Sequence, residues 1–198
     1  MKADRRTRRS REKLQQALIE LLLEKSYTTI SIRDITERAN IGYATFFRHY
    51  DGMDALLADA FQQSVDQLLS VLQLLGDKKS PVKEGQVVFE HVAAHHDLYQ
   101  VFLKGEGTQV LVDQIQREAV KELVMRFARS TSDMPAAILA NHVVASIIAL
   151  IKWWLRNDMP FSPERMGAIY ADLIIRPVQQ HLGASDSYVP PLNHGGAG

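Results

Sequence analysis

The sequence predicts an all-α protein of about nine helices. Apolar residues recur at intervals of three and four along most of the chain, which is the spacing of one face of a helix. Gly, Pro, Ser and Asn stand at the breaks between these segments, as they do at helix ends. No segment alternates apolar and polar residues as a half-buried strand does, and no internal repeat is visible.

The first 25 residues divide into a basic segment and a helix. Residues 1–9 have no apolar periodicity, so we expect a flexible arm there. A helix is predicted from Ser10 to about Lys25, because an apolar stripe at helical spacing can pack it across the following segment. The stripe consists of Leu14, Ala17, Leu18, Leu21 and Leu22.

Residues 31–50 predict two short helices joined by a tight turn. Ser31 can cap the first helix, and Asp34, three residues later, can reach back to the free amide groups. Asn40 stands where the chain must leave this helix, and Asn tolerates the left-handed conformation better than most residues. The second helix is expected over Tyr43–His49. Two short helices at a sharp angle form a helix-turn-helix.

The remaining helices are longer. They are predicted, in order, over Met53–Leu75, Pro81 to His95 or His96, Asp97–Leu103, Thr108–Arg129, Pro135–Asn157 and Ser162–Leu182. Pro135–Asn157 is apolar around much of its circumference and therefore needs more than one packing partner. Pro177 should kink or loosen the final turn of the last helix. Residues 183–198 have little to bury and are expected to be a disordered tail.

Length and composition narrow the class of protein. With 198 residues and 46% hydrophobic content, the chain can form a sizeable core of one or two domains. The absence of cysteine excludes disulfides and thiolate metal sites and fits a cytoplasmic protein. The N-terminus leads into no apolar signal region. Because the most apolar run, Val143–Ile151, is too short to span a bilayer, we expect a soluble protein without a membrane partner.

The net charge of zero hides an asymmetry. Residues 1–50 contain 11 Lys and Arg against 6 Asp and Glu, whereas residues 51–198 contain 12 against 17. A basic head on an acidic body is expected if only the head meets an anionic polymer. A solvated basic tail would give the same count. Its position beside a helix-turn-helix favours double-stranded DNA as the partner.

Residues 10–57 resemble the DNA-binding domain of the TetR/AcrR family of bacterial transcriptional regulators. The residues in register with the family pattern are Ser31, Ile35–Thr36, Asn40–Ile41–Gly42 and Ala44–Thr45–Phe46–Phe47–Arg48–His49–Tyr50. The resemblance implies a DNA-binding domain over 10–53 and a helical ligand-binding and dimerisation domain over 54–182. It also implies a homodimer, most often a repressor, on a near-palindromic operator.

The resemblance also implies which residues contact DNA. They are Arg5, Arg6 and Arg8 in the arm, Ser31 and Arg33 in the first short helix, and Gly42, Tyr43, Ala44, Thr45, Phe47, Arg48 and His49 around the second. Tyr43 and Thr45 carry groups that can meet base edges or thymine methyls. Arg48 and His49 are placed for backbone contact, whereas Phe46 and Tyr50 are expected in the core.

Two positions depart from the family pattern. The usual Tyr, whose hydroxyl donates to a phosphate, is Phe47 here, and the usual Lys at the start of the next helix is Met53. Each lost contact should weaken binding and flatten its salt dependence. The arginines of residues 1–9 can compensate for this loss.

In the family, the second domain usually holds a pocket for a small apolar or amphipathic organic ligand that disfavours DNA binding. Residues with pocket-like chemistry are Phe89, His95, Tyr99, Phe102, Phe127, His142 and Trp153. Plain core packing is the alternative for each. The family's last two helices form the dimer interface, for which the candidates are Ile147, Ile151, Trp154, Ile169, Tyr170 and Leu173. They could equally complete the core of a monomer.

Other functions have less support. Among His91, His95 and His96, residues four apart share a helix face and could bind a metal together. No third ligand is evident beyond Asp97 or Glu90, so no metal site is predicted. No phosphate-binding loop, nucleophile elbow or other catalytic motif is present, so we expect neither an enzyme nor a cofactor. Two alternatives remain, both with the same fold. One is a protein that organises chromosomes or controls division, and the other is a ligand sensor with weakened DNA binding.

Overall fold

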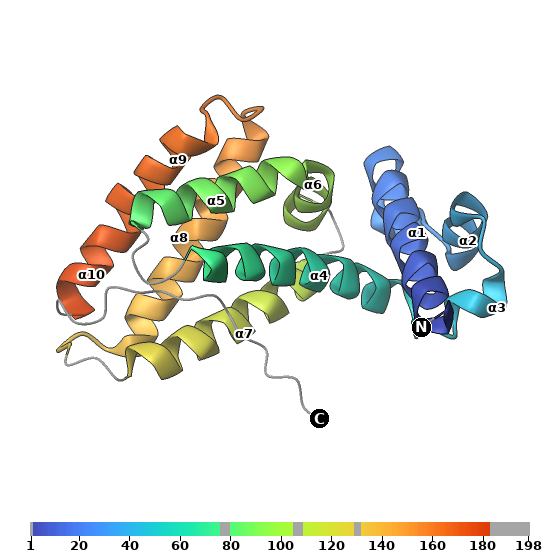
Figure 1. Cartoon of the computed structure of the whole chain (residues 1–198), viewed down its shortest axis with the longest axis horizontal. Helices are drawn as coiled ribbons and strands as arrows, with labels where there is room; N and C mark the ends of the chain where they lie inside the picture. Colours follow the sequence, from blue (N-terminus) through green and yellow to red (C-terminus); the bar gives the residue numbers. More distant parts are fainter. Residues whose placement is uncertain (1, 76–79, 105–108, 129–131, 183–198) are drawn as a thin grey trace. The chain divides into compact units, whose positions relative to one another are not determined.

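Every regular element in the computed structural model is helical, as predicted (Figure 1). The structure describes residues 2–75, 80–104, 109–128 and 132–182. Its elements are α1 (Lys2–Glu24), η1 (Tyr27–Thr29), α2 (Ile32–Ala39), α3 (Tyr43–Phe46), α4 (Met53–Leu74), α5 (Pro81–Ala94), α6 (His96–Lys104), α7 (Gln109–Phe127), α8 (Ala136–Arg156), α9 (Pro163–Tyr170), η2 (Ala171–Ile175) and α10 (Arg176–Leu182). Because α9, η2 and α10 follow without a break, the described residues contain nine helices beside the 3₁₀ turn η1.

The chain divides into two compact units. The first combines Met1–Ser64 with Asp97–Val112, and the second combines Val65–His96 with Asp113–Gly198. The predicted DNA-binding domain ended at residue 53, whereas the first unit also takes in the first half of α4 and most of α6. The reason is visible in an aromatic cluster within this unit. Phe61 of α4 stacks on Phe102 of α6 at a centroid distance of 3.9 Å, and the ring of Tyr99 meets the Phe61 ring edge-on.

Helix α1 begins earlier than the sequence predicted. We expected residues 1–9 to form a flexible arm, but the helix starts at Lys2. Lys and Arg are good helix formers, and no Gly or Pro interrupts the segment. Arg8 also pairs with Glu12 one turn later, with 3.4 Å between Nε and Oε1, which supports an exposed helix.

In the second unit, two glycines bring α5 and α9 into backbone contact. A Cβ added at Gly85 would lie 2.8 Å from the Cα of Gly167, and one added at Gly167 would lie 2.5 Å from the backbone of α5. Real Cβ atoms do not approach backbone so closely, so only glycine permits this crossing. The ring of Tyr170 also lies against Gly85. Burial and the neighbouring Glu84 carboxylate raise the pKa of Tyr170.

The last helix contains one wide turn. Sequence predicted that Pro177 would loosen the final turn, and the irregularity lies one turn earlier, in the π-helical turn η2. There the Arg176 amide donates to the carbonyl oxygen of Ala171, five residues back. Proline has no amide hydrogen and its ring clashes with the carbonyl of the fourth residue before it, here Leu173. A widened turn accommodates that clash.

Helix α8 is the most apolar element. Among the described residues it alone is long and apolar enough to cross a membrane by length and composition, with a mean hydropathy of 1.7. The core helix of a soluble protein can pass the same test. Only 28% of this apolar stretch is buried inside the protein, so much of its surface needs another partner.

Candidate nucleic-acid interface

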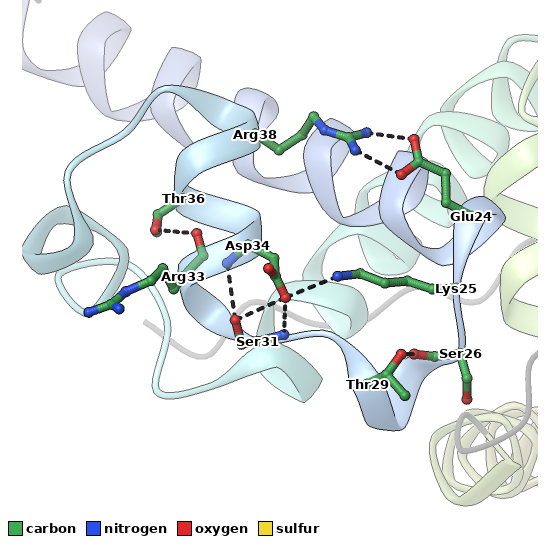
Figure 2. A network of polar contacts seen from close by, with 9 residues as sticks. All are labelled: Glu24, Lys25, Ser26, Thr29, Ser31, Arg33, Asp34, Thr36 and Arg38. Carbon is green, nitrogen blue, oxygen red and sulfur yellow. Dashed lines mark hydrogen bonds and ion pairs between the residues drawn. The ribbon is translucent and has the colours of Figure 1, made fainter.

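A complete capping box fixes the start of α2. The Asp34 amide donates to Ser31 Oγ at 3.1 Å, and the Ser31 amide donates to Asp34 Oδ2 at 2.8 Å (Figure 2). The Ser31 hydroxyl also donates to Asp34 Oδ2, at 2.9 Å. Two amides that the helix itself cannot satisfy are therefore bonded reciprocally, as the sequence predicted.

Three ion pairs connect α2 to the end of α1, one of them between Arg38 Nη1 and Glu20 Oε2 at 3.6 Å. Lys25 Nζ lies 3.1 Å from Asp34 Oδ2, and the two terminal nitrogens of Arg38 donate to both oxygens of Glu24 (Figure 2). The hydrogen bond from the Ser31 amide, reinforced by Lys25 and the Ser31 hydroxyl, lowers the pKa of Asp34 to about 2. These links hold α2 in one orientation against α1.

The turn after α2 has the predicted left-handed residue. Asn40 has φ 52° and ψ 50°, and its amide donates to the Glu37 carbonyl oxygen at 3.1 Å. The Ile41 amide donates to the Thr36 carbonyl oxygen at 2.9 Å. Asn is one of the few residues that enter this conformation at low cost, so the angle between the two helices is encoded locally.

Helix α3 is shorter than predicted and is fixed by burial. It is regular only over Tyr43–Phe46, with a turn at residues 47–49 in place of the predicted continuation to His49. The amides of His49 and Tyr50 both donate to the Phe46 carbonyl oxygen, which closes the helix early. Phe46 is fully buried, and its ring contacts that of Tyr50, which is also buried. The predicted core role of both residues is confirmed.

Tyr50 is also part of a polar cluster that the sequence did not reveal. Its hydroxyl donates to Asp59 Oδ2 at 2.6 Å, and Gln15 donates to the same oxygen at 2.7 Å. Arg11 pairs with Asp59 and donates to the Tyr50 hydroxyl. Burial, reinforced by Asp59, raises the pKa of Tyr50 to about 12. The cluster joins α1, the end of the helix-turn-helix and α4 through one carboxylate, and only tertiary contact makes it visible.

The exposed side chains of α3 are aromatic and basic. Tyr43 is 54% exposed and Phe47 is 47% exposed, and their rings meet edge-on with centroids 5.2 Å apart. Arg48 follows them and is also exposed. An open hollow of about 630 Å³ runs between α2 and α3, lined by Arg33, Thr36, Glu37, Asn40, Ile41, Gly42 and Tyr43. This surface offers ring faces, amides and cations together.

The other residues predicted to contact DNA are accessible where the structure describes them. Arg6, Arg8, Ser31, Arg33, Gly42 and Ala44 are exposed, and Thr45 and His49 are partly exposed. The side chain of Arg5 lies outside the described residues. Burial and the nearby guanidinium groups of Arg11 and Arg48 lower the pKa of His49. Arg11 of α1 donates to the hydroxyl of Tyr50, shortly after α3, while the DNA contacts themselves stay predictions.

The predicted pocket residues are divided between the two units. Tyr99 and Phe102 belong to the aromatic cluster of the first unit, and Phe89 and Phe127 are buried in the second. His95 is partly buried, and its Nδ1 lies 3.0 Å from the His91 carbonyl oxygen. The centroids of the two imidazole rings are 4.2 Å apart. No group of three metal-binding side chains occurs within the described ranges. His142 is exposed, and a shared pocket stays a prediction.

The two adjacent tryptophans differ in burial. Trp154 was assigned to a dimer interface, but it is 1% exposed, meets Phe89 edge-on and donates from Nε1 to the Phe161 carbonyl oxygen at 3.0 Å. Trp153 was assigned to the pocket and is 46% exposed, so that assignment stays a prediction. Burial likewise places Ile151 and Tyr170 in the protomer core. An apolar helix leaves such a choice open until its neighbours are known.

The other interface candidates remain near the surface. Ile147 and Ile169 are partly exposed, and Leu173 is 64% exposed. A hollow of about 350 Å³ lies between α8 and the last helix, lined by Ser146, Ala149, Leu150, Trp153, Leu173 and Ile174. Exposed apolar residues of this size mark a surface where another molecule can bind.

Two family profiles match the chain. Residues 15–60 match the profile for bacterial regulatory proteins of the tetR family, and residues 86–176 match a transcriptional regulator C-terminal region. The first match contains the whole helix-turn-helix. The second contains α8 and the start of the last helix.

One curated protein and two solved structures extend this similarity. The chain is 29% identical over 167 residues to the uncharacterized HTH-type transcriptional regulator YxbF of Bacillus subtilis strain 168. The alignment covers 81% of this chain but only 43% of that relative.

The two solved structures share the fold. One is NalD, the secondary repressor of the MexAB-OprM multidrug efflux pump of Pseudomonas aeruginosa, with TM-score 0.68, 18% identity and coverage of 90% of this chain and 98% of that one. The other is Bacillus subtilis FadR in complex with stearoyl-CoA, with TM-score 0.63, 12% identity and coverage of 83% and 97%.

Proposed function

Because the chain belongs to the TetR family of transcriptional regulators, we propose that it is a homodimeric, cytoplasmic repressor. In this proposal it binds a near-palindromic operator and is released by a small organic ligand. The carrying observation is the surface of the helix-turn-helix. Its buried side holds Phe46, while Tyr43, Ala44 and Arg48 point outward. The relatives named above are regulators, and we assign the chain no catalytic role.

In this proposal, α3 enters the major groove and α2 lies across the phosphates. Ser31 and Arg33 stand at the start of α2, where an exposed cation and backbone amides can contact phosphate. Arg6 and Arg8 supply further phosphate contacts from the exposed side of α1. They offset the donors that Phe47 and Met53 lack. Deleting residues 2–9 should therefore reduce affinity sharply at moderate salt, because several counterion-releasing contacts are lost together.

We place the dimer interface on α8 and the last helix. Support comes from the exposed side chains of Trp153 and Leu173 and from the hollow between these helices. The low burial of α8 as a whole points the same way. A two-fold dimer would present two copies of α3 to half-sites roughly 10 base pairs apart or a multiple of that distance.

The proposal also includes release by a ligand. The FadR structure contains stearoyl-CoA, which is a property of that protein. In this chain, we propose an apolar or amphipathic ligand because buried aromatic side chains such as Phe89 and Phe127 dominate the candidate residues.

The test is selection of binding sites from random DNA duplexes with purified full-length protein. Fluorescence anisotropy of the selected duplex at two salt concentrations follows. Enrichment of a palindrome, bound well above random DNA, supports the dimeric regulator. Weak binding that disappears with salt, without enrichment, leaves only an electrostatic surface and favours the ligand sensor. Mapping the chromosomal sites then separates promoter control from a role in chromosome organisation or division.

A further inference from the structure

The side chain of Arg48 folds back along α3. Its Nη2 donates to Thr45 Oγ1 at 2.8 Å, and its Nε lies 3.5 Å from the Ala44 carbonyl oxygen. Its position after the regular part of α3 suggested a contact with the DNA backbone. The guanidinium instead lies beside the residues that would face the floor of the major groove.

Arg48 is free of acidic partners, unlike two other arginines of the first unit. Arg11 pairs with Asp59, and Arg38 with Glu24. Within the part of the chain that the structure describes, no carboxylate forms an ion pair with Arg48, and Thr45 Oγ1 is its close acceptor. A guanidinium has five donor hydrogens in a planar fork. Thr45 therefore orients the group while leaving most of its donors for another molecule.

The neighbouring side chains suit a partner with a defined hydrogen-bonding edge. The exposed rings of Tyr43 and Phe47 bracket this part of α3 and carry no charge. A planar fork can donate to two acceptors at fixed separation, on a phosphate or on a base edge. The position of the guanidinium beside Ala44 and Thr45 favours a base edge here. Among base pairs, guanine presents such a pair in the major groove, O6 and N7.

We propose that Arg48 is a base-reading residue that recognises guanine through O6 and N7, and that Thr45 is a positioning residue that orients its guanidinium. This inference rests on the proposed function, because it requires that α3 enter the major groove. It changes the role of Arg48 from a contact that adds affinity on any DNA to one that selects sequence.

The experiment uses the full chain and the duplex recovered by selection. Each guanine is replaced in turn by 7-deazaguanine, which removes the N7 acceptor and retains O6. We expect wild-type affinity to fall about tenfold at one guanine in each half-site. The Arg48→Ala variant should bind the unmodified duplex more weakly and should be insensitive to 7-deazaguanine at that position.

Variants of Thr45 test the positioning role. Thr45→Val keeps the branched shape but removes the acceptor, so it should reduce the penalty for 7-deazaguanine. Thr45→Ser retains the hydroxyl and should restore the penalty. Arg33→Ala is the matched control for a phosphate contact. It should weaken all duplexes alike and reduce the salt slope by about 1.

Three outcomes would overturn the inference. In the first, Arg48→Ala weakens every duplex equally, reduces the salt slope as Arg33→Ala does and keeps the sensitivity to 7-deazaguanine. In the second, a sequence is enriched but no guanine in it responds to 7-deazaguanine. The proposed function then stands without this inference. In the third, the wild type enriches no sequence, and the proposed function fails together with the inference.

Discussion

The two short helices of the helix-turn-helix are fixed in different ways. Helix α2 has a capping box at its start, a left-handed Asn40 at its end and ion pairs from Asp34 and Arg38 to the end of α1. Helix α3 begins at Tyr43 after Gly42, which has no side chain that could cap it, and its regular part has four residues. Its position depends on the burial of Phe46. Helix α2, which we propose crosses the DNA backbone, is thus held by polar links. Helix α3, which we propose reads the bases, is held by one apolar side chain.

On α2 and α3, different side chains serve stability and the proposed recognition of DNA. Polar links at the ends of α2 use side chains that cannot then contact DNA, such as that of Arg38. On α3 the stabilising group points inward, so Tyr43, Phe47 and Arg48 remain available on the outside. Substitutions in the two helices should therefore differ in the size of their effect on stability.

The largest effect is expected from Phe46→Ala. Removing a fully buried ring leaves a cavity under α3 and should lower the free energy of unfolding by about 3–5 kcal/mol. Phe47→Ala is the matched control. It removes the neighbouring ring, which is half-exposed, and should lower the free energy of unfolding by roughly 1 kcal/mol or less. Urea denaturation followed by circular dichroism measures both. Equal losses would mean that α3 is not held by the burial of Phe46.

A smaller effect is expected from Ser31→Ala. Loss of the cap at the start of α2 should cost about 1 kcal/mol. Ser26→Ala is the control, since Ser26 precedes the 3₁₀ turn η1 but makes no side-chain cap there, and it should change stability by less than roughly 0.5 kcal/mol. The same denaturation experiment applies. If the two variants were equally stable, the capping box would contribute nothing in solution.

The polar links of α2 should also depend on pH. The pKa of Asp34 is lowered to about 2 in the folded protein, so its contribution is complete above the ordinary value of about 4. It is lost as pH falls from there toward about 2. The stability difference between wild type and Asp34→Asn should therefore shrink over that interval. A flat difference for Asp34→Asn would exclude this role.

The smallest effect is expected from Gly42→Ser, which gives α3 the cap it lacks. Gly42 has φ −62° and ψ 137°, and a Cβ there would lie 3.7 Å from Thr45 Oγ1, an ordinary contact. Serine should stabilise by a few tenths of a kcal/mol, and Gly42→Ala should destabilise, because Ala is a poorer cap than Gly. Differential scanning calorimetry can resolve the opposite signs. A loss of stability with Ser would show that a polar cap does not fit at this turn.

Local features were predictable from sequence, and features set by distant neighbours were not. The Ser31–Asp34 box, the left-handed Asn40 and the buried Phe46 follow from spacings of a few residues. By contrast, Asp59 acquires its role from Arg11 and Tyr50, which are far from it in sequence. No local pattern marks such a cluster.

Two errors have a similar origin. The role of Trp154 depends on where Phe89 and the Phe161 carbonyl lie, and an apolar helix gives no preference between adjacent residues. At the N-terminus, the lack of apolar periodicity suggested an unstructured arm. The helix propensity of Lys and Arg and the Arg8–Glu12 pair favour the helix instead.

The wide turn η2 shifts by one position the residues that lie on the buried face of the helix after it. A π turn holds one more residue than an α turn before its hydrogen bond closes, so the buried positions advance by one after Ala171–Ile175. Ile174 and Ile175 within the turn are both buried, and Val178 and Leu182 then continue the buried side. Deleting one residue within this turn would make the helix regular without moving that face. An insertion or deletion elsewhere in α9 or α10 would rotate Val178 and Leu182 out of the core.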